Sequence, residues 1–281
     1  MVKIILIMVK IFLFSVLFLI INSISSPAEE KKSFSFAIVP MFTPDFIQKN
    51  WGPILKEISA KTGYNFEIKI YKTIKDFEQE IFNNSLDFAY VNPFQAVIAY
   101  EKSKYSPILR NNSPLLGILV TKKDSPLKTL VSLDGKKVAF ASPSCPIYIY
   151  LTIYVFKKYN IKINPVFVKT HDNVYRHVLF GLADAGGAVN ISFLKQSDEI
   201  KNNLHIIYTT PPFGSHPIIV NPRVPTEVVE KFVNAFIELN KNPALKDYFY
   251  KIQIPNPVRT NYEKDYKQLK FILPNRDSPV C

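Results

Sequence analysis

Two hydroxyls and a thiol lie close together in the segment KKVAFASPSCPIYIY, which spans residues 136–150. The letters VAF are typical of a buried strand, and the proline after the thiol is favoured at the first position of a helix. Ser142, Ser144 and Cys145 therefore fall between a strand and a helix. Serines at such a place are either donors to a ligand or turn residues, and a lone cysteine is most often a small buried hydrophobic residue.

The thiol could also take part in catalysis. A helix start favours the thiolate form of a cysteine, and His171 followed by Asp172 has the parts of a base with an orienting carboxylate. The same histidine could instead donate to an oxyanion, or pack at the start of its own helix. The histidines and cysteines show no metal-ligand spacing, so the sequence predicts no metal or other cofactor.

The first 28 residues are typical of a secretory signal peptide. Lys3 and Lys10 precede an apolar run at 11–21, and small residues at 26–28 follow as a cleavage site. The alternative is an uncleaved membrane anchor, because an apolar stretch counted from Ile4 is nearly long enough to span a bilayer. The sequence thus predicts a periplasmic or extracytoplasmic protein, which is membrane-anchored if the segment is uncleaved.

The chain is basic, with 281 residues and a formal net charge of +12. Loss of residues 1–28 removes two lysines and no acid, which leaves +10. Such a charge favours an anionic partner or surface, although scattered lysines also solubilise a surface without any partner. The only cysteines are Cys145 and Cys281, and both are expected to be free thiols because Cys281 is the last residue.

The order of expected elements predicts an α/β fold. Strands at 33–40, 64–71 and 86–91 alternate with helical patterns, which is the rhythm of a parallel sheet covered on both faces. The pattern restarts at 115–123 and includes a later helix at 225–239. Two successive units of this kind predict two lobes. Their junctions are expected near residues 118–126 and 208–216.

Ligands in such sheets bind beyond the carboxyl ends of the strands, so residues at strand ends are the candidates for binding. Asn92 is expected to cap a helix that begins at Pro93, and the N–H groups that follow it could face the cleft. Tyr90 could belong to the core or to the cleft wall. The predicted ligand-binding residues are Thr43, Tyr90, Asn92, Ser142, Ser144, Cys145 and His171.

Four segments are distinctive when they are taken together: LDFAYVNPFQAV, VTKKDSPLKTLVSLDGKKVAF, DGKKVAFASPSC and THDNVYRHVLFGLADAGGAV. In this order and spacing they resemble the phosphate-, phosphite- and phosphonate-binding periplasmic proteins of ABC uptake systems, over residues 33–240. The resemblance implies a two-lobed periplasmic-binding-protein fold of type II, in which each lobe is a mostly parallel sheet flanked by helices. Lobe 1 would comprise residues 29–118 and 213–281, and lobe 2 would comprise residues 119–212.

The resemblance also implies a function. The protein would capture a small oxyanion in a cleft that closes by a hinge, and would then dock on an ABC transporter permease. It would be a monomer that binds no nucleic acid and catalyses no reaction. A module of the same fold that signals ligand occupancy to a membrane receptor is the alternative.

Hydroxyls at a helix start suit an oxyanion, because the free N–H groups and the positive end of the helix dipole point at one place. Pro146 removes only one donor, and the N–H groups of Ile147 and Tyr148 remain. The family's loop commonly reads Ser-Ser-Thr-Ser-Gly where this chain reads SCPIY at residues 144–148, so hydroxyl donors are lost and a weak thiol donor replaces one of them. The bulky Ile147 and Tyr148 are expected to narrow the mouth of the cleft.

A second departure concerns the ligand's substituent. His216 stands where aminoalkylphosphonate binders of the family carry an acid for the ligand's amine. This difference predicts a ligand without an amine.

Overall fold

The computed structural model describes residues 31–143 and 145–272. The predicted signal peptide at 1–28, Ser144 and Cys281 lie outside the described residues. The described residues from Ser33 onward form a single compact unit. Among the residues that are described, none of the helices combines the length and the apolar character that crossing a membrane requires.

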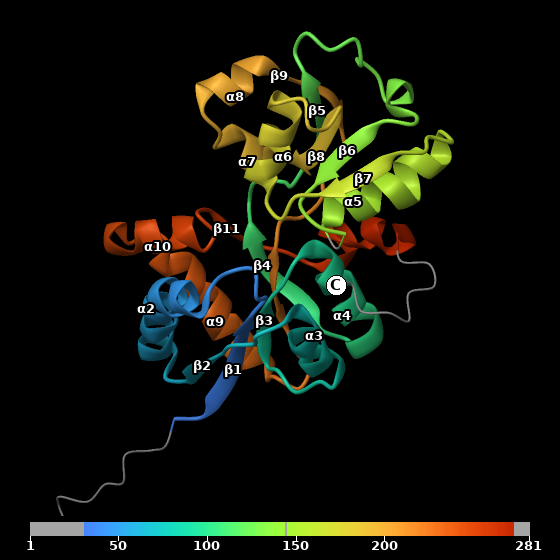
Figure 1. Ribbon diagram of the computed structural model, residues 1–281. Helices are drawn as coiled ribbons and strands as arrows, with labels where there is room; N and C mark the ends of the chain where they lie inside the picture. Colours follow the sequence, from blue (N-terminus) through green and yellow to red (C-terminus); the bar gives the residue numbers. More distant parts are fainter. Residues whose placement is uncertain (1–30, 144, 273–281) are drawn as a thin grey trace, which may run out of the picture. The chain divides into compact units, whose positions relative to one another are not determined.

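The first sheet has six strands in the order β11-β4-β10-β3-β1-β2 (Figure 1). The strands are β1 (Ser33–Ile38), β2 (Asn65–Lys69), β3 (Phe88–Tyr90), β4 (Ser106–Asn111), β10 (Pro217–Val220) and β11 (Pro257–Arg259). β1 pairs in parallel with β2 and β3. The three remaining pairings, β10 with β3, β10 with β4 and β11 with β4, are antiparallel.

Helices cover both faces of this sheet, with α2 and α9 on one face and α3 and α4 on the other (Figure 1). The elements are α2 (Pro44–Thr62), α3 (Ile74–Phe82), α4 (Pro93–Ser103), α9 (Thr226–Leu239), η3 (Pro243–Leu245), α10 (Lys246–Lys251), α11 (Tyr262–Asp265) and η4 (Lys267–Ile272). The core between β1, β3, α2 and α9 is aromatic: Phe36 lies 5.2 Å from Trp51 and Phe88 lies 4.8 Å from Phe232, ring centre to ring centre. Rings of this size bury the most apolar surface per residue.

The second sheet has five strands in the order β7-β6-β8-β5-β9. The strands are β5 (Gly117–Lys122), β6 (Lys137–Phe140), β7 (Asn164–Phe167), β8 (Ala185–Val189) and β9 (Leu204–Thr209). The helical elements are η1 (Val131–Leu133), α5 (Pro146–Tyr150), the π-helix η2 (Leu151–Phe156) that continues α5, α6 (His171–Leu179), α7 (Asn190–Leu194) and α8 (Asp198–Asn203). β6 is parallel to β7 and β8, whereas β5 is antiparallel to β8 and β9.

The predicted α/β class with two helix-flanked sheets is confirmed, but the sheets are mixed rather than mostly parallel. The reason is the path of the chain. Of the strands that carry the chain between the sheets, β10 runs antiparallel to β3 and β5 runs antiparallel to β8. β4 and β9 in turn pair antiparallel with β10 and β5. The exact lobe boundaries stay a prediction. The first junction, expected near residues 118–126, lies earlier in the chain, because residues 117–122 form β5 of the second sheet.

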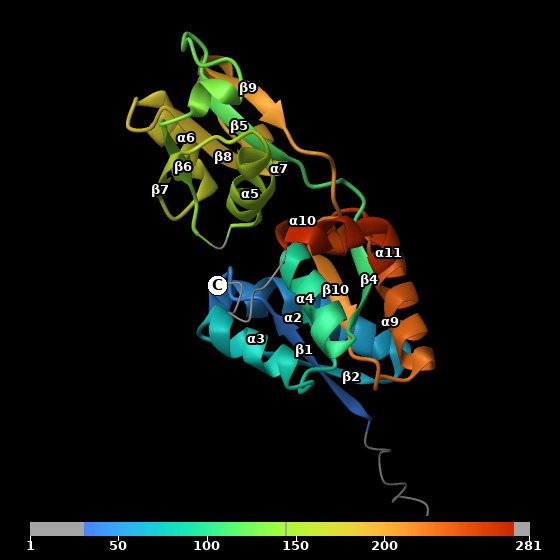
Figure 2. The same ribbon diagram turned by 90° about the vertical axis from the view of Figure 1, so that its right-hand side faces the viewer.

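Two chain segments connect the sheets, and they are hydrogen-bonded to each other (Figure 2). Leu115 and Phe213 exchange backbone hydrogen bonds of 2.9 and 3.1 Å. The N–H of Gly117 donates to Oγ1 of Thr210 at 2.9 Å, and the N–H of Thr210 donates back to the carbonyl of Gly117 at 2.9 Å. We call residues 112–117 and 210–216 the crossing segments. Their mutual pairing satisfies backbone groups that would otherwise be buried without partners.

Asp265, near the C-terminal end of the described residues, anchors the second crossing segment. Arg110 donates from Nε and Nη2 to the two carboxylate oxygens of Asp265, both at 3.1 Å, and these side chains are only 13% and 10% exposed. Burial alone would raise the pKa of Asp265, but the hydrogen bonds from Arg110 and Thr260 hold it below its usual value. The carbonyl of Asp265 accepts the N–H of Gly214 at 3.1 Å. A buried, doubly bonded pair thus holds the second crossing segment in place.

Gly117 leaves no room for a side chain in the first crossing segment. A Cβ at this position would lie 1.9 Å from Cδ1 of Ile147 and 2.8 Å from Cγ2 of Thr210. We expect Gly117→Ala to lower the free energy of unfolding by about 1–3 kcal/mol, because the added methyl overpacks the site. Ile147→Val removes Cδ1, so the double variant should lose less stability than the sum of the single variants. Urea unfolding of the four chains measures this, and strictly additive losses would contradict the contact.

Candidate ligand-binding site

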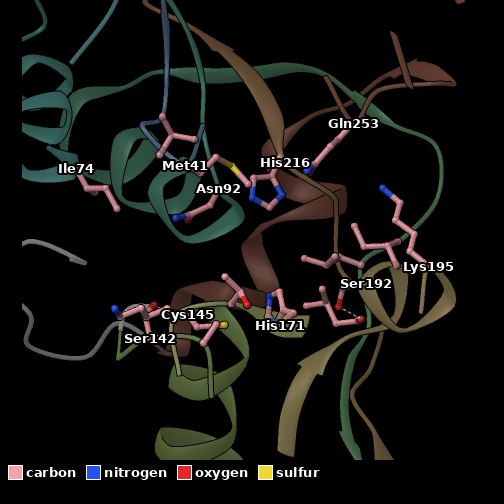
Figure 3. A pocket seen from close by; sticks show the side chains of 17 residues that line it. Met41, Ile74, Asn92, Ser142, Cys145, His171, Ser192, Lys195, His216 and Gln253 are labelled. Atoms are coloured by element: carbon pink, nitrogen blue, oxygen red, sulfur yellow. Dashed lines mark hydrogen bonds between the residues drawn. The ribbon is translucent and has the colours of Figure 1, made fainter. Parts of the chain in front are cut away.

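A cavity of about 420 Å³ lies beyond the carboxyl ends of strands from both sheets. Five parallel strands reach it: β1 and β3 in the first sheet, and β6, β7 and β8 in the second. From the first sheet and the crossing segments it is lined by Val39, Met41, Ile74, Asn92, Leu115, His216 and Gln253. From the second sheet it is lined by Ala141, Ser142, Cys145, Lys169, Thr170, His171, Val189, Ile191, Ser192 and Lys195. Figure 3 shows the labelled members of the two groups as opposing walls.

Four of the predicted residues line this cavity, namely Asn92, Ser142, Cys145 and His171. Thr43 does not: it is exposed and caps α2, where its hydroxyl accepts the N–H of Phe46 at 3.3 Å. Tyr90 is 1% exposed and belongs to the core, with its ring between Trp51 at 5.0 Å and His216 at 5.8 Å. Ser144 lies outside the described residues.

Asn92 is held rigidly at the start of α4. Its Oδ1 accepts the N–H groups of Phe94 and Gln95, both at 2.9 Å, so these two groups do not face the cavity. Gln95 completes the capping box by accepting the N–H of Asn92 at 3.0 Å, and its own amide donates to the buried Glu78 at 2.9 Å. This arrangement assigns Oδ1 of Asn92 to the helix. Its Nδ2 is the donor that remains for a ligand.

Ser142 and Cys145 form part of the wall opposite Asn92 and His216 (Figure 3). Ser142 lies two residues after the end of β6, and its carbonyl accepts the N–H of Cys145 at 3.2 Å. Cys145 precedes α5, is 6% exposed and forms no disulfide within the described residues. The strand end and the helix start therefore meet at the cavity.

The expected narrowing of the mouth by Ile147 and Tyr148 is wrong, since neither is among the described residues that line the cavity. Ile147 is fully buried and its side chain fills the space beside Gly117. Tyr148 packs edge-on between Phe140 at 4.9 Å and Phe167 at 5.1 Å. The first turn of α5 points these side chains into the core of the second sheet.

His171 is the first residue of α6, which Thr170 caps by accepting the N–H of Asn173 at 3.2 Å. Its Nδ1 is buried and has no hydrogen-bond partner within the described residues. Burial lowers the pKa of His171, although Asp172 acts in the opposite direction. The carboxylate of Asp172 instead accepts a hydrogen bond from Nε2 of Gln196 at 2.7 Å. No described hydrogen bond therefore orients His171 as a base for the thiol.

His216 faces His171 from the opposite wall (Figure 3). Burial, and secondarily the nearby His171, lower the pKa of His216 to about 4. Both rings are accordingly neutral near pH 7. A neutral imidazole still donates one hydrogen bond to an oxyanion.

Several cavity residues were not among the predicted contacts, and two of them are cationic. Lys169 and Lys195 line the second-sheet wall, and no carboxylate is among the described lining residues. Lys195 also places its Nζ 5.1 Å from the ring centre of Tyr250 on α10. Lys169 and Gln253 adopt φ angles of 74° and 66°. This left-handed conformation is uncommon for residues other than glycine. Sequence patterns carry no signal for such long-range placements.

The lowered histidine pKa values predict a pH-dependent stability. The folded protein favours neutral rings, so the unfolded chain binds protons first as the pH falls below about 6.5. The contribution of these two neutral histidines to the free energy of unfolding is therefore fully present above that pH. It is lost as the pH falls toward 4, which lowers the stability by on the order of 1–3 kcal/mol. We expect His216→Asn to reduce this loss, as measured by urea midpoints between pH 7 and 4.5. The exposed His205 on β9 is the control, because His205→Asn should keep the parent's pH profile; equal profiles for all three chains would contradict the assignment.

Comparison with known proteins places the chain. A family model described as "ABC transporter, phosphonate, periplasmic substrate-binding protein" matches residues 36–266. The Phosphonates-binding periplasmic protein of Escherichia coli (strain K12) is 22% identical in an alignment of 246 residues that covers 80% of this chain and 72% of that protein.

Solved structures share the fold. A binding protein component of an ABC phosphonate transporter from Pseudomonas aeruginosa has a TM-score of 0.63 at 18% identity, covering 83% of this chain and 82% of that one. PhnD1 from Prochlorococcus marinus, in complex with methylphosphonate, has a TM-score of 0.66 at 16% identity, covering 86% and 97%. The predicted resemblance and the two-lobed fold are thereby confirmed. The chain belongs to the family of periplasmic substrate-binding proteins of phosphonate ABC transporters.

Proposed function

We propose that this chain captures a small oxyanion without an amine, of the phosphonate, phosphite or phosphate type, and presents it to the permease of an ABC transporter. The observation that carries the proposal is the cavity at the strand ends. It combines hydroxyl, amide and imidazole donors with two lysines, and no carboxylate is found among its described lining residues. A lining of hydrogen-bond donors and cations favours an anionic ligand.

The donors are arranged to hold a tetrahedral group from two sides. Ser142 and His171 offer a hydroxyl and an imidazole from the second-sheet wall, and Nδ2 of Asn92 faces them from the first. α6 begins at His171, so its dipole and first N–H groups favour negative charge at the cavity. Lys169 and Lys195 add attraction from the rim.

The same lining disfavours an ammonium group. A buried ammonium needs a carboxylate or several carbonyl acceptors, and the described lining contains lysines instead. His216, which stands where the family's amine binders carry an acid, offers no negative charge in either protonation state. The function therefore includes selection against amine-bearing phosphonates.

We also propose how the whole chain is organised. Residues 1–28 serve as a signal peptide, and the mature chain is an extracytoplasmic monomer without enzymatic activity. Residues 29–118 with 213–281 form one lobe and residues 119–212 the other. The crossing segments act as the hinge on which the lobes close.

Thermal-shift and calorimetric titrations with phosphite, phosphate, methylphosphonate, sulfate and 2-aminoethylphosphonate test the proposed ligand class. We expect binding of at least one tetrahedral phosphorus oxyanion, with 2-aminoethylphosphonate weaker than methylphosphonate. The absence of binding for all five probes would contradict the proposal.

Asn92→Asp tests the site. The aspartate keeps an oxygen that caps α4 but replaces the Nδ2 donor with negative charge, so affinity for the bound oxyanion should fall at least tenfold at nearly unchanged stability. Asn92→Ala is the matched control, because it loses the cap as well and should cost about 0.5–2 kcal/mol of stability. Undiminished binding by Asn92→Asp would place the oxyanion elsewhere.

Cys145→Ser separates binding from catalysis. The thiol is a weak donor, so a hydroxyl in its place should leave oxyanion affinity equal or slightly higher. Calorimetry measures the affinity, and phosphorus NMR of the incubated ligand reveals any turnover. Ligand turnover by the parent that Cys145→Ser abolishes would overturn the non-enzymatic function.

A further inference from the structure

The first-sheet wall of the cavity is mainly apolar. Val39, Met41, Ile74 and Leu115 line it. Val39 and Leu115 are only 3% and 2% exposed, whereas Met41 is 45% exposed although its side chain lines a cavity. An apolar side chain in this position gains free energy when a ligand's apolar surface covers it.

This wall is built on fixed elements. Met41 lies in a tight turn after β1, where its N–H donates to the carbonyl of Val39 at 2.7 Å. The next residue, Phe42, stacks on Phe46 of α2 with ring centres 4.5 Å apart. Ile74 is the first residue of α3, which Thr73 caps by accepting the N–H of Asp76 at 3.1 Å. The apolar surface is therefore held in place before a ligand arrives.

The cavity is also large for an oxyanion alone. Its volume of about 420 Å³ corresponds to roughly 14 water molecules at about 30 Å³ each. A phosphorus atom with its oxygens takes the place of only about three or four of these. In the described conformation, before the proposed closure of the lobes, a phosphite or methylphosphonate ligand would leave most of the space, including the apolar wall, to water.

From these observations we propose that the preferred ligand is an oxyanion with a neutral, apolar substituent of about four to eight carbons, such as an alkyl- or arylphosphonate. This inference rests on the proposed function and names the substrate class of the same site. The oxyanion binds the polar second-sheet wall beside Ser142 and His171. The substituent lies against Met41, Ile74 and Leu115, which determine specificity by excluding water from the substituent.

A chain-length series tests this directly. Calorimetry at pH 7.5 with phosphite and with methyl-, propyl-, hexyl- and phenylphosphonate measures affinity against substituent size. Each methylene that enters the apolar part should raise affinity about fourfold, since a buried CH₂ contributes about 0.8 kcal/mol. The heat-capacity change should become more negative along the series.

Two variants locate the substituent. Met41→Ser should weaken hexylphosphonate about tenfold or more while it leaves phosphite within about twofold, because only the longer ligand covers this side chain. The matched control is Leu182→Ser, which removes a comparably exposed apolar residue (56%, against 45% for Met41) that is not among the described lining residues. Leu182→Ser should bind both ligands as the parent does.

The outcomes distinguish this inference from the function on which it rests. A series in which affinity stays flat or falls from methyl to hexyl would overturn the apolar substituent while the oxyanion function stands. Equal weakening of phosphite and hexylphosphonate by Met41→Ser would also overturn it. Failure of every probe to bind, phosphite and hexylphosphonate included, would overturn the proposed function together with the inference.

Discussion

The pairing of the two crossing segments is the constraint on which the site depends. Leu115 with Phe213 and Gly117 with Thr210 form a short ribbon, and this ribbon is the covalent path between the sheets. Its buried backbone groups must find partners, and they find them in each other and in neighbours such as Asn190. The carboxyl ends of both sets of parallel strands consequently reach one cavity. Asp265 adds its backbone carbonyl to the ribbon from the far end of the described chain.

The electrostatics of the cavity follow from the cost of burying charge. His171 and His216 are both driven toward the neutral form by burial, because an unpaired charge in a poorly solvated place is expensive. Positive charge is left to Lys169 and Lys195, which are exposed to water. The cavity thus holds neutral donors without the free-energy cost of buried cations. An incoming anion supplies the charge that turns these neutral donors into charge-assisted hydrogen bonds.

Local patterns predicted much of this site, and long-range pairing decided the rest. Strand ends and helix starts are local features, so Asn92, Ser142 and His171 could be predicted. Thr43 and Tyr90 also stand at a helix start and a strand end, but the direction of a side chain depends on what surrounds it, and Thr43 caps α2 while Tyr90 enters the core. Likewise, the mixed sheets and the presence of Gln253 arise from contacts between elements far apart in sequence. The hydrophobic periodicity of the sequence does not predict contacts of this kind.

The altered loop before α5 connects these observations. Where the family commonly has small polar residues, this chain places Ile147 beside Gly117 and Tyr148 among aromatic rings, so the first turn of α5 contributes packing rather than side-chain donors. The loss of about two neutral hydrogen bonds weakens oxyanion binding by roughly 1–3 kcal/mol. Covering two to four methylenes of a ligand recovers a similar amount, at about 0.8 kcal/mol each. An apolar wall at Met41 and Ile74 can therefore offset a loop with fewer hydroxyls, and the two departures become parts of one binding site.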